Sequence, residues 1–563
     1  MDQLSGPGGE NLERRAILAT VLALIVLLGY YAFFMPTPPP PPAEPEKAQT
    51  EVAEEVVTPP VSTTKPETPS KIQPISGPLK RAEREEEVVL ETDLLSVTLS
   101  NRGGGVRSWK LKQYEETAGF VDLVGALPEE GAPLPLATSI QGGEGATGLY
   151  RIVERPRASP TEPQRVVMEF QEASGIVLEK TVILYPDSYL ADVQIRLKNL
   201  GQAATQGPLR LQWGPGFRIG TNDKVAGQAT PAAWIDGKLV NPEAEEPGQE
   251  LTQSGKIGWM ALQDLYFAAA LIPGEADPSS FVAKDAEGMQ LVGLLYPAMR
   301  IAPGTAKKVE MKLYAGPKEI TRLRAAGHNL RELVYLGWFD FLARPALYFL
   351  QFLYGFIGNY GVAIIIITVL QKLVFYPLTQ KSHKSMQAMQ TLQPKMQALK
   401  ERHKNNPQKV NQETMELYKK HGVNPVGGCL PMLIQIPIFI ALYNALGSSV
   451  ELWHAPFALW ITDLSAPDTL FTIPFGADVF AVRALALIMG ISMFIQQKMS
   501  PTGGDPRQAK MMLYMMPIMF TFIFWSMPSG LVLYWLINNV LQIGHQYHMN
   551  RGLKLSPATG KTE

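Results

Sequence analysis

Residues 361–380 read GVAIIIITVLQKLVFYPLTQ, and this run constrains the fold more than any other stretch of the chain. If the run is helical, its stretch of Ile, Val and Leu residues is long enough to cross the hydrocarbon core of a bilayer. Lys372 nevertheless lies inside it, and a cation at the bilayer centre costs roughly 2.5–3.5 kcal/mol on insertion scales. Thr368, Lys372 and Tyr376 would share one face of the helix. Such a lysine either snorkels to the headgroups or serves a function in a hydrated cavity.

Composition excludes several classes of protein. A length of 563 residues exceeds one ordinary domain, and a net charge of −1 argues against a general nucleic-acid binder. The single cysteine, Cys429, excludes an intramolecular disulfide and a cysteine-based zinc site. His545 and His548 stand three residues apart with no carboxylate nearby in sequence, which favours interfacial histidines over a metal site. No nucleotide-binding or nucleophile motif is present, so we expect no catalytic residues, no cofactor and no metal.

The N-terminal region is predicted to be an anchor followed by a tether. Arg14 and Arg15 precede the apolar run 16–35, which ends without a small-x-small cleavage site, and this favours a retained transmembrane anchor over a secretory signal. Arginines before the helix place residues 1–15 in the cytoplasm. Residues 36–87 are rich in Pro, Glu, Thr and Lys, which predicts a disordered tether.

Residues 88–316 show apolar–polar alternation with Gly- and Pro-rich turn signals between the alternating runs. Repeated half-buried strands of this kind predict an antiparallel β-sandwich. With a cytoplasmic N-terminus and one span before it, this domain is expected outside the cytoplasm. The alternating apolar residues are Val166, Met168, Phe170, Val193, Ile195, Leu197, Val309, Met311 and Leu313.

Two helical regions flank the opening span. Residues 317–357 combine many aromatic residues with Asp340 and Arg344. This combination predicts helices that lie in the headgroup interface on the outer, non-cytoplasmic side of the membrane. Residues 381–427 are rich in Lys and carry an apolar stripe broken before Pro407, which predicts a cytoplasmic helical hairpin. The hairpin residues singled out are Met386, Met389, Met396 and Lys400.

Four more spans are predicted, at about 429–450, 479–496, 511–527 and 530–543. The loop 451–478 has no Lys or Arg, whereas the other connections and the tail are basic, so six spans with both termini inside satisfy the charge bias. Polar side chains occur within these spans, and each amide either bonds a neighbouring helix or lines a wet cavity with Lys372. The candidate lining residues are Thr368, Lys372, Tyr376, Gln435, Tyr534 and Asn538.

Four segments carry a resemblance to a known family: NPVGGCLPMLIQIPIFI at 424–440, PFALWITDLS at 456–465, QKMSPT at 497–502 and MPSGLVLYWL at 527–536. They resemble the YidC/Oxa/Alb membrane-protein insertases, and the order of elements resembles the Gram-negative form with a large periplasmic domain. The resemblance implies a β-supersandwich, five spans forming the insertase core, and a hydrophilic groove. In that family a positive residue in the first core span lies in the groove, and its place falls on Lys372. Most bacterial relatives carry Arg there, and Lys keeps the charge without the planar fork.

The resemblance implies a membrane protein insertase and chaperone of the bacterial inner membrane, acting alone or with the Sec translocon. Expected partners are nascent inner-membrane proteins and the lipid bilayer, with Sec components and the ribosome as further candidates and no direct contact with nucleic acid. The alternatives are a small-solute transporter using Lys372 and a ligand sensor using the β-domain. The expected organisation is 1–15 cytoplasmic N-terminus, 16–35 anchor, 36–87 tether, 88–316 periplasmic β-sandwich, 317–357 interfacial helices, 358–380 second span, 381–427 cytoplasmic hairpin, 428–550 spans three to six of the core, and 551–563 cytoplasmic tail.

Overall fold

The chain forms two compact units, Met1–Leu333 and Val334–Glu563, in a computed structural model. The first is called the β-domain below and the second the helical unit. The predicted anchor, the tether up to residue 80 and the tail from residue 555 lie outside the described residues. The structure describes residues 81–116, 119–124, 133–140, 143–157, 159–217, 229–275, 277–284, 289–403, 406–423, 426–475, 478–500 and 506–554.

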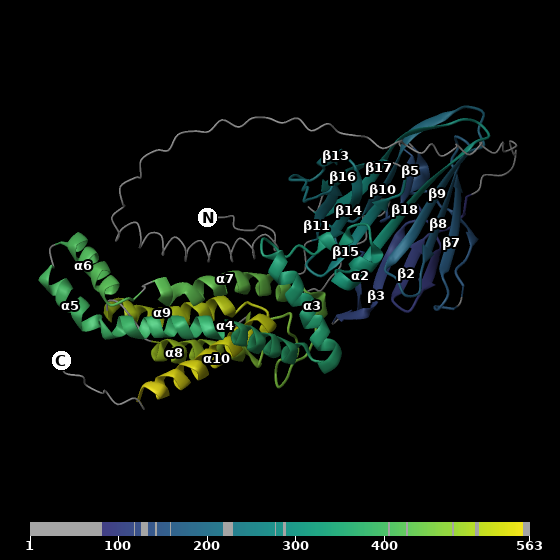
Figure 1. The fold of residues 1–563 in the computed structure, drawn as a ribbon. Helices are drawn as coiled ribbons and strands as arrows, with labels where there is room; N and C mark the ends of the chain where they lie inside the picture. The colour runs from purple at the N-terminus through teal and green to yellow at the C-terminus, as the bar shows by residue number, and fades with distance from the viewer. Residues whose placement is uncertain are drawn as a thin grey trace, which may run out of the picture. The chain divides into compact units, whose positions relative to one another are not determined.

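Three antiparallel sheets build the β-domain (Figure 1). They are a nine-stranded sheet β12-β11-β14-β15-β18-β9-β8-β7-β6, a five-stranded sheet β13-β16-β17-β10-β5 and a four-stranded sheet β1-β2-β3-β4. The strand β17 packs across β14 and β9, so the two larger sheets face each other as the layers of a sandwich. The strands are β1 (Glu87–Glu91), β2 (Leu95–Ser100), β3 (Val106–Glu116), β4 (Gly119–Asp122), β5 (Thr138–Ile140), β6 (Arg151–Glu154), β7 (Gln164–Gln171), β8 (Ile176–Leu184), β9 (Leu190–Asn199), β10 (Thr205–Trp213), β11 (Thr230–Ile235), β12 (Lys238–Val240), β13 (Glu250–Gln253), β14 (Ile257–Gln263), β15 (Phe267–Pro273), β16 (Ser279–Lys284), β17 (Gln290–Ile301) and β18 (Ala306–Pro317).

The alternating apolar residues of the sequence form the core of the β-domain. In the β9–β18 ladder Ile195 stands opposite Val309, and all the alternating apolar residues named above are buried. Because side chains alternate between the faces of a strand, each such run buries one face and leaves the other polar. The predicted antiparallel β-sandwich is therefore confirmed. At its centre Trp109 meets the ring of Trp213 edge-on at 5.8 Å and donates from its indole Nε1 to the carbonyl of Ala315 at 3.0 Å.

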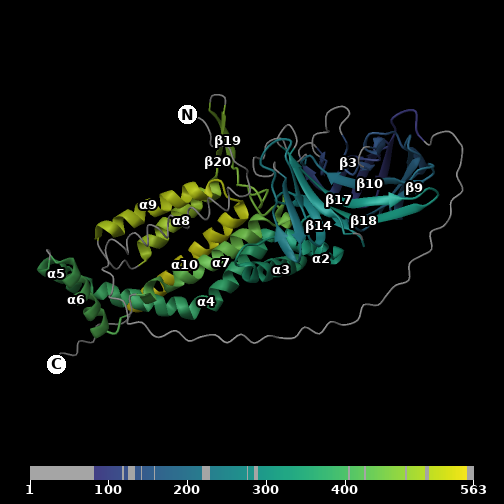
Figure 2. The ribbon, with the colours of Figure 1, turned by 90° about the horizontal axis from the view of Figure 1, so that it is seen from above.

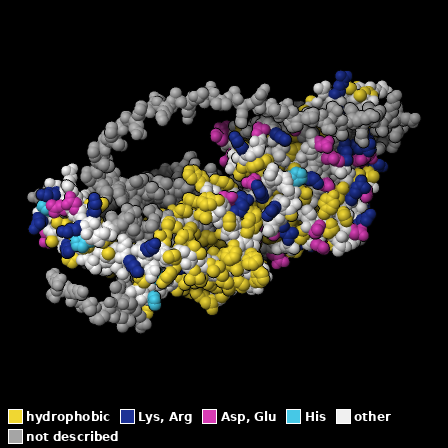
Figure 3. Space-filling model, viewed as in Figure 1, with side chains coloured by type: hydrophobic (Ala, Val, Ile, Leu, Met, Phe, Trp, Pro, Cys, Tyr) yellow, Lys and Arg dark blue, Asp and Glu magenta, His cyan; other side chains and the backbone are white. Residues whose placement is uncertain are grey.

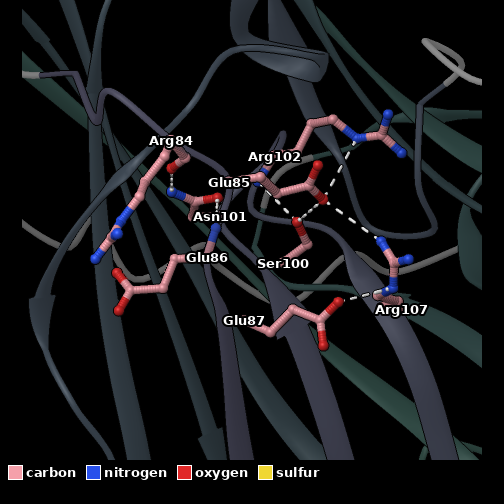
Figure 4. A network of polar contacts seen from close by, with 8 residues as sticks. All are labelled: Arg84, Glu85, Glu86, Glu87, Ser100, Asn101, Arg102 and Arg107. Atoms are coloured by element: carbon pink, nitrogen blue, oxygen red, sulfur yellow. Dashed lines mark hydrogen bonds and ion pairs between the residues drawn. The ribbon is translucent and has the colours of Figure 1, made fainter.

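A polar network holds the segment that precedes β1 in place (Figure 4). The side chain of Asn101 accepts from the backbone N–H of Glu86 at 2.8 Å and donates to the carbonyl of Arg84 at 3.1 Å. Ser100 donates to the carboxylate of Glu85 at 2.8 Å, and Arg107 pairs with Glu85 and Glu87. The described residues 81–86, which their composition assigns to the tether, are thus held against the domain by side chains distant in sequence.

Lys180 gives the β-domain a predicted pH dependence. Its side chain is fully buried, and its ammonium donates to the carbonyls of Gly104 and Leu136. Burial lowers the pKa of Lys180 from 10.5 to about 7. Between these two pH values the unfolded chain binds the extra proton, so stability should rise with pH, by roughly 4 kcal/mol over three pH units.

The measurement is urea unfolding of the wild type, of Lys180→Met and of a control, Lys110→Met, at pH 7 to 10. Lys110 is exposed, so its variant should keep the wild-type slope of stability against pH. Lys180→Met should lose most of the rise, and an unchanged slope in that variant would contradict the assignment to Lys180.

Helices α4, α7, α8, α9 and α10 run side by side in the helical unit, and α5 and α6 lie beyond one end of α4 (Figures 1 and 2). Within the described residues, α4 is the one helix long and apolar enough to cross a membrane, and shorter apolar helices occupy Ile434–Gly447, Ala484–Met499 and Met511–Phe524. The count of six spans is therefore not confirmed and stays a prediction. The helices are α2 (Ile320–Ala326) and η2 (Leu330–Leu333) at the end of the β-domain, then α3 (Asp340–Ile357), α4 (Tyr360–Thr391), α5 (Gln393–Arg402), α6 (Pro407–Lys420), α7 (Val426–Gly447), η3 (Val450–Leu452), α8 (Ala484–Met499), α9 (Pro506–Phe524) and α10 (Ser529–Lys554).

The helix α4 is longer than the span predicted at 358–380. It passes through Pro377 and continues for eleven residues beyond 380, to Thr391. Those residues include Gln, Lys, Met and Ala, which favour a helix as strongly as apolar residues do. The change of polarity near residue 380 therefore does not end the helix, and the first part of the predicted hairpin is a continuation of α4.

The start of α4 is fixed by a loop between α7 and α8. Asn359 accepts from the N–H of Val362 at 3.1 Å as the N-cap, and its amide donates to the carbonyl of Phe457 at 3.0 Å. A Cβ added at Gly361 would lie 2.1 Å from the ring of Phe457. Gly361 is thus required for the ring of Phe457 to pack on the first turn of α4.

Gly361→Val is therefore expected to destabilise the helical unit by about 1–3 kcal/mol, as overpacked sites do. The control is Gly355→Val in α3, where an added Cβ meets nothing within 4 Å. Thermal unfolding in detergent micelles should show a lower midpoint for Gly361→Val than for Gly355→Val. Equal midpoints would show that the Phe457 ring moves away freely.

The prediction of a span at 479–496 is wrong at its start. Residues Asp478–Val482 form strand β20, which pairs with β19 (Phe471–Phe475), and the helix begins only at Ala484. Short apolar runs of β-branched and aromatic residues suit a strand as well as a helix, and periodicity does not separate the two. The β-hairpin formed by β19 and β20 projects from the helical unit near the ends of α8 and α9 (Figure 2).

Candidate functional site

Lys372 lines a pocket between α4 and α10. The pocket is open to its surroundings, has a volume of about 270 Å³, and has no Asp or Glu among its lining residues. The ammonium of Lys372 donates to the amide oxygen of Asn538 on α10 at 3.3 Å. The lining residues are Val369, Lys372, Leu373, Tyr376, Leu541, His545 and His548.

One helix turn separates Lys372 from Tyr376 on α4, which brings both into the pocket. The ring of Tyr376 meets the ring of His545 edge-on at 5.0 Å. His545 in turn meets His383, a buried residue of α4, at 5.7 Å between ring centroids. His545 and His548 were expected to be interfacial histidines and not metal ligands, and the structure places both in the lining of the pocket of Lys372. The heptad-like spacing of His545 from Asn538 and Tyr534 on one helix could have indicated this.

Tyr534 is the centre of a second polar cluster. Its buried hydroxyl accepts from the amide of Gln435 on α7 at 2.6 Å and lies 3.3 Å from the amide of Gln371 on α4. Three helices thus meet at one hydroxyl. Sequence reasoning missed Gln371, although an amide next to a lysine in an apolar run was a signal for it. Bonds of this kind between helices are worth about 0.6–2 kcal/mol each in a membrane.

Thr368 does not line the pocket. Its side chain is buried, and its hydroxyl donates to the carbonyl of Ile364 on its own helix at 2.7 Å. A threonine that bonds the carbonyl four residues earlier satisfies its polar group locally, so it can face apolar neighbours. Sharing a helix face with Lys372 was therefore insufficient to predict a shared environment.

The residues predicted for the cytoplasmic hairpin lie on two helices. Met386 and Met389 are half-buried on the last turns of α4, and Met396 is half-buried on α5. The hydroxyl of Tyr418 on α6 donates to the sulfur of Met396 at 3.0 Å, which joins α5 to α6. Lys400 is exposed on α5.

The surface of the helical unit is strongly apolar. Figure 3 shows hydrophobic side chains gathered over its helices, with Lys and Arg gathered around α5 and α6. Large apolar residues on α8 and α9 are exposed, among them Ile491 and Phe522. A soluble protein rarely exposes a continuous apolar area of this size, whereas a lipid-facing surface requires one. Together with the β-domain, this surface and the pocket lysine define a membrane protein with a large extramembrane domain.

Comparisons with known proteins identify the family. The sequence model described as the YidC periplasmic domain matches residues 87–349, and the one described as the 60Kd inner membrane protein matches residues 352–556. The chain is 37% identical over 562 residues to the membrane protein insertase YidC of Syntrophus aciditrophicus, covering 96% of this chain and 100% of that protein. It is 39% identical over 473 residues to the one of Geobacter sulfurreducens, covering 83% and 87%. The chain therefore belongs to the YidC family of membrane protein insertases.

A solved structure is similar to most of the chain. It is an active YidC insertase with its first transmembrane domain resolved, 18% identical, covering 85% of this chain and 95% of that chain with a TM-score of 0.36. The four segments that carried the resemblance in the sequence all lie within the range of the second family model.

Proposed function

We propose that this protein inserts other membrane proteins, its clients, into the bacterial inner membrane and assists their folding. The observation that carries the proposal is the pocket of Lys372, a cationic site without a carboxylate among its lining residues, between helices whose outer surfaces are apolar. A client whose hydrophilic flank must cross the membrane would pass that flank beside Lys372, with Tyr376, Gln435, Tyr534 and Asn538 as polar neighbours. Thr368, whose hydroxyl bonds the carbonyl of Ile364 on its own helix, is not among these neighbours.

The energetics need no nucleotide. A client helix of about 20 apolar residues gains about 0.3–0.6 kcal/mol for each residue on insertion, so the transfer itself is downhill. The barrier is the passage of the polar flank through hydrocarbon, where charges are costly. A cationic pocket lowers that barrier for acidic flanks, and the membrane potential adds about 2.3 kcal/mol per charge per 100 mV in the same direction.

The proposed arrangement follows from charge and polarity. Six spans, both termini in the cytoplasm and the β-domain in the periplasm satisfy the distribution of basic loops. The basic helices α5 and α6, with Lys400 and the methionines Met386, Met389 and Met396, then form a cytoplasmic surface for emerging clients. The Sec translocon and the ribosome are proposed as further partners at this stage of client delivery.

The test reconstitutes the purified full chain into liposomes and supplies a short client with one span. Insertion is read as protection of the client's translocated flank from added protease. Vesicles with the protein should protect several times more client than protein-free vesicles, without nucleotide. Equal protection in both would contradict the proposal.

A further inference from the structure

The β-hairpin of β19 and β20 exposes apolar side chains at one end of the helical unit. Among the described residues its two strands pair only with each other, and the run 470–482 contains one charged residue, Asp478. Apolar side chains gathered on an exposed element mark a surface that another molecule or a lipid phase covers. The large apolar residues exposed on the β-hairpin and at its base are Leu470, Phe471, Ile473, Val479 and Phe480.

The two faces of the β-hairpin differ in polarity. In the β19–β20 ladder Ile473 stands opposite Phe480. Residues opposite each other share a face, and every second residue along a strand returns to it, so one face consists of large apolar side chains. This face, called the aromatic face below, comprises Phe471, Ile473, Phe480 and Val482. The opposite face comprises Thr472, Pro474, Val479 and Ala481.

The aromatic face is continuous with the apolar surface of the helices. The ring of Phe480 lies 5.6 Å from the ring of Trp525, which directly follows α9. Phe522, on the last turn of α9, is exposed and belongs to the surface that lipid would cover. The aromatic face therefore extends that surface past the end of α9.

The direction of the β-hairpin defines its depth in a membrane. It runs across the direction of α8 and α9 (Figure 2). Membrane helices tilt by about 20° from the bilayer normal on average, so an element that runs across them lies close to the membrane plane. The outer backbone edges of a two-stranded hairpin need hydrogen-bond partners that hydrocarbon does not supply. The headgroup region supplies water to these edges and lipid chains to the aromatic face.

The β-hairpin lies at the end of the helical unit where α4 begins. The loop that leads to it bonds the starts of two helices, since Asn359 before α4 donates to the carbonyl of Phe457 at 3.0 Å and the N–H of Gly530 in α10 donates to the carbonyl of Leu464 at 2.9 Å. The basic helices α5 and α6 lie beyond the other end of α4 (Figures 1 and 2). With those helices in the cytoplasm, the β-hairpin lies at the outer leaflet.

We propose that the β-hairpin of β19 and β20 is an interfacial anchor, which lies flat among the outer headgroups with its aromatic face turned toward the lipid chains. The α8 helix has 16 residues, about 24 Å, and does not by itself span a hydrocarbon core of about 30 Å. Because α8 begins two residues after β20, the anchor fixes the depth of its outer end. The inference goes beyond client insertion and takes from the proposed function only the cytoplasmic placement of α5 and α6.

The test attaches a fluorescent label to one cysteine at a time in the full chain, in lipid nanodiscs without a client. Ile473→Cys labels the aromatic face and Val479→Cys the opposite face, both in a Cys429→Ser background because Cys429 is the one native cysteine. The quenchers are a nitroxide lipid with its spin near the headgroup, one with its spin near the chain end, and aqueous iodide. An interfacial apolar face is buried about 5–10 Å, so the first lipid should quench residue 473 roughly threefold more than residue 479. Iodide should show the reverse order.

The control is Val153→Cys on β6, which is 55% exposed against 67% for Val479 and should be quenched by iodide alone. Equal access of iodide to residues 473 and 153 would overturn the inference, because the β-hairpin would then lie in water. Protection of residue 473 from all three quenchers would overturn it as well, since a second copy or another protein would then cover the aromatic face. Strongest quenching by the chain-end nitroxide would place the β-hairpin in the hydrocarbon core, which also contradicts the proposal. None of these results depends on client insertion.

Discussion

Lys372→Glu is expected to lower insertion of a client with an acidic N-terminal flank by roughly tenfold or more. The substitution replaces attraction by repulsion in a pocket whose other described lining residues include no Asp, Glu, Lys or Arg. Burial strengthens this change because charges near a low-dielectric wall are poorly screened. The measurement is protease protection of the client in liposomes of the purified variant.

The matched variants are Lys372→Arg and Lys372→Ala. Arg keeps the charge and should insert the acidic client within about twofold of the wild type, whereas Ala should give an intermediate value. A client whose flank carries no charge should be inserted equally by all of these variants. If Lys372→Glu inserted the acidic client as well as the wild type, the electrostatic role of this residue would be abandoned.

Trp109→Ala is expected to destabilise the β-domain by about 3–5 kcal/mol. Its ring is fully buried against Trp213, and its indole N–H is bonded to the carbonyl of Ala315, so the variant loses packing and leaves that carbonyl without its partner. The loss of stability is measured by urea unfolding of the β-domain, with limited proteolysis as the readout of the unfolded fraction. The control, Trp338→Ala, removes a tryptophan that is 91% exposed and should leave the β-domain unchanged.

The same variant tests whether insertion depends on the β-domain. Because the helical unit is compact by itself and contains Lys372, insertion by Trp109→Ala should stay within about twofold of the wild type below the unfolding temperature. Removal of residues 90–312 should give the same result. Complete loss of insertion in both variants would favour a sensor or recognition role for the β-domain.

The β-sandwich could be predicted from the sequence because its strands each have one buried face. The alternation in β7, β9 and β18 records that burial directly, and the turn residues between the strands mark their ends. Lys180 could not be predicted as a core residue, since it lies between two other polar residues of β8, Glu179 and Thr181, and is nevertheless buried. Long-range bonds of this kind have no local sequence signal.

In the helical unit some predictions were correct and others were wrong. The apolar run correctly predicted a helix that contains Lys372. Its end was predicted where the apolar residues end, near residue 380, but α4 continues to Thr391 because the residues that follow are good helix formers. The strand β20 was interpreted as the start of a helix because a run of four apolar residues, 479–482, has no distinguishing period. Gln371, His383 and His545 were missed as site residues because their proximity depends on the packing of α4 against α10.

The most direct test of the central claim places a photo-crosslinking residue in the pocket. Leu373→benzoylphenylalanine puts the probe on a pocket-lining residue, and Leu487→benzoylphenylalanine puts it on an exposed position of α8 outside the pocket lining. During insertion the acidic flank of the client should crosslink at residue 373 and not at residue 487, and Lys372→Glu should abolish the crosslink. Equal crosslinking at both positions, or none at residue 373 while the client is inserted, would contradict passage of the client beside Lys372.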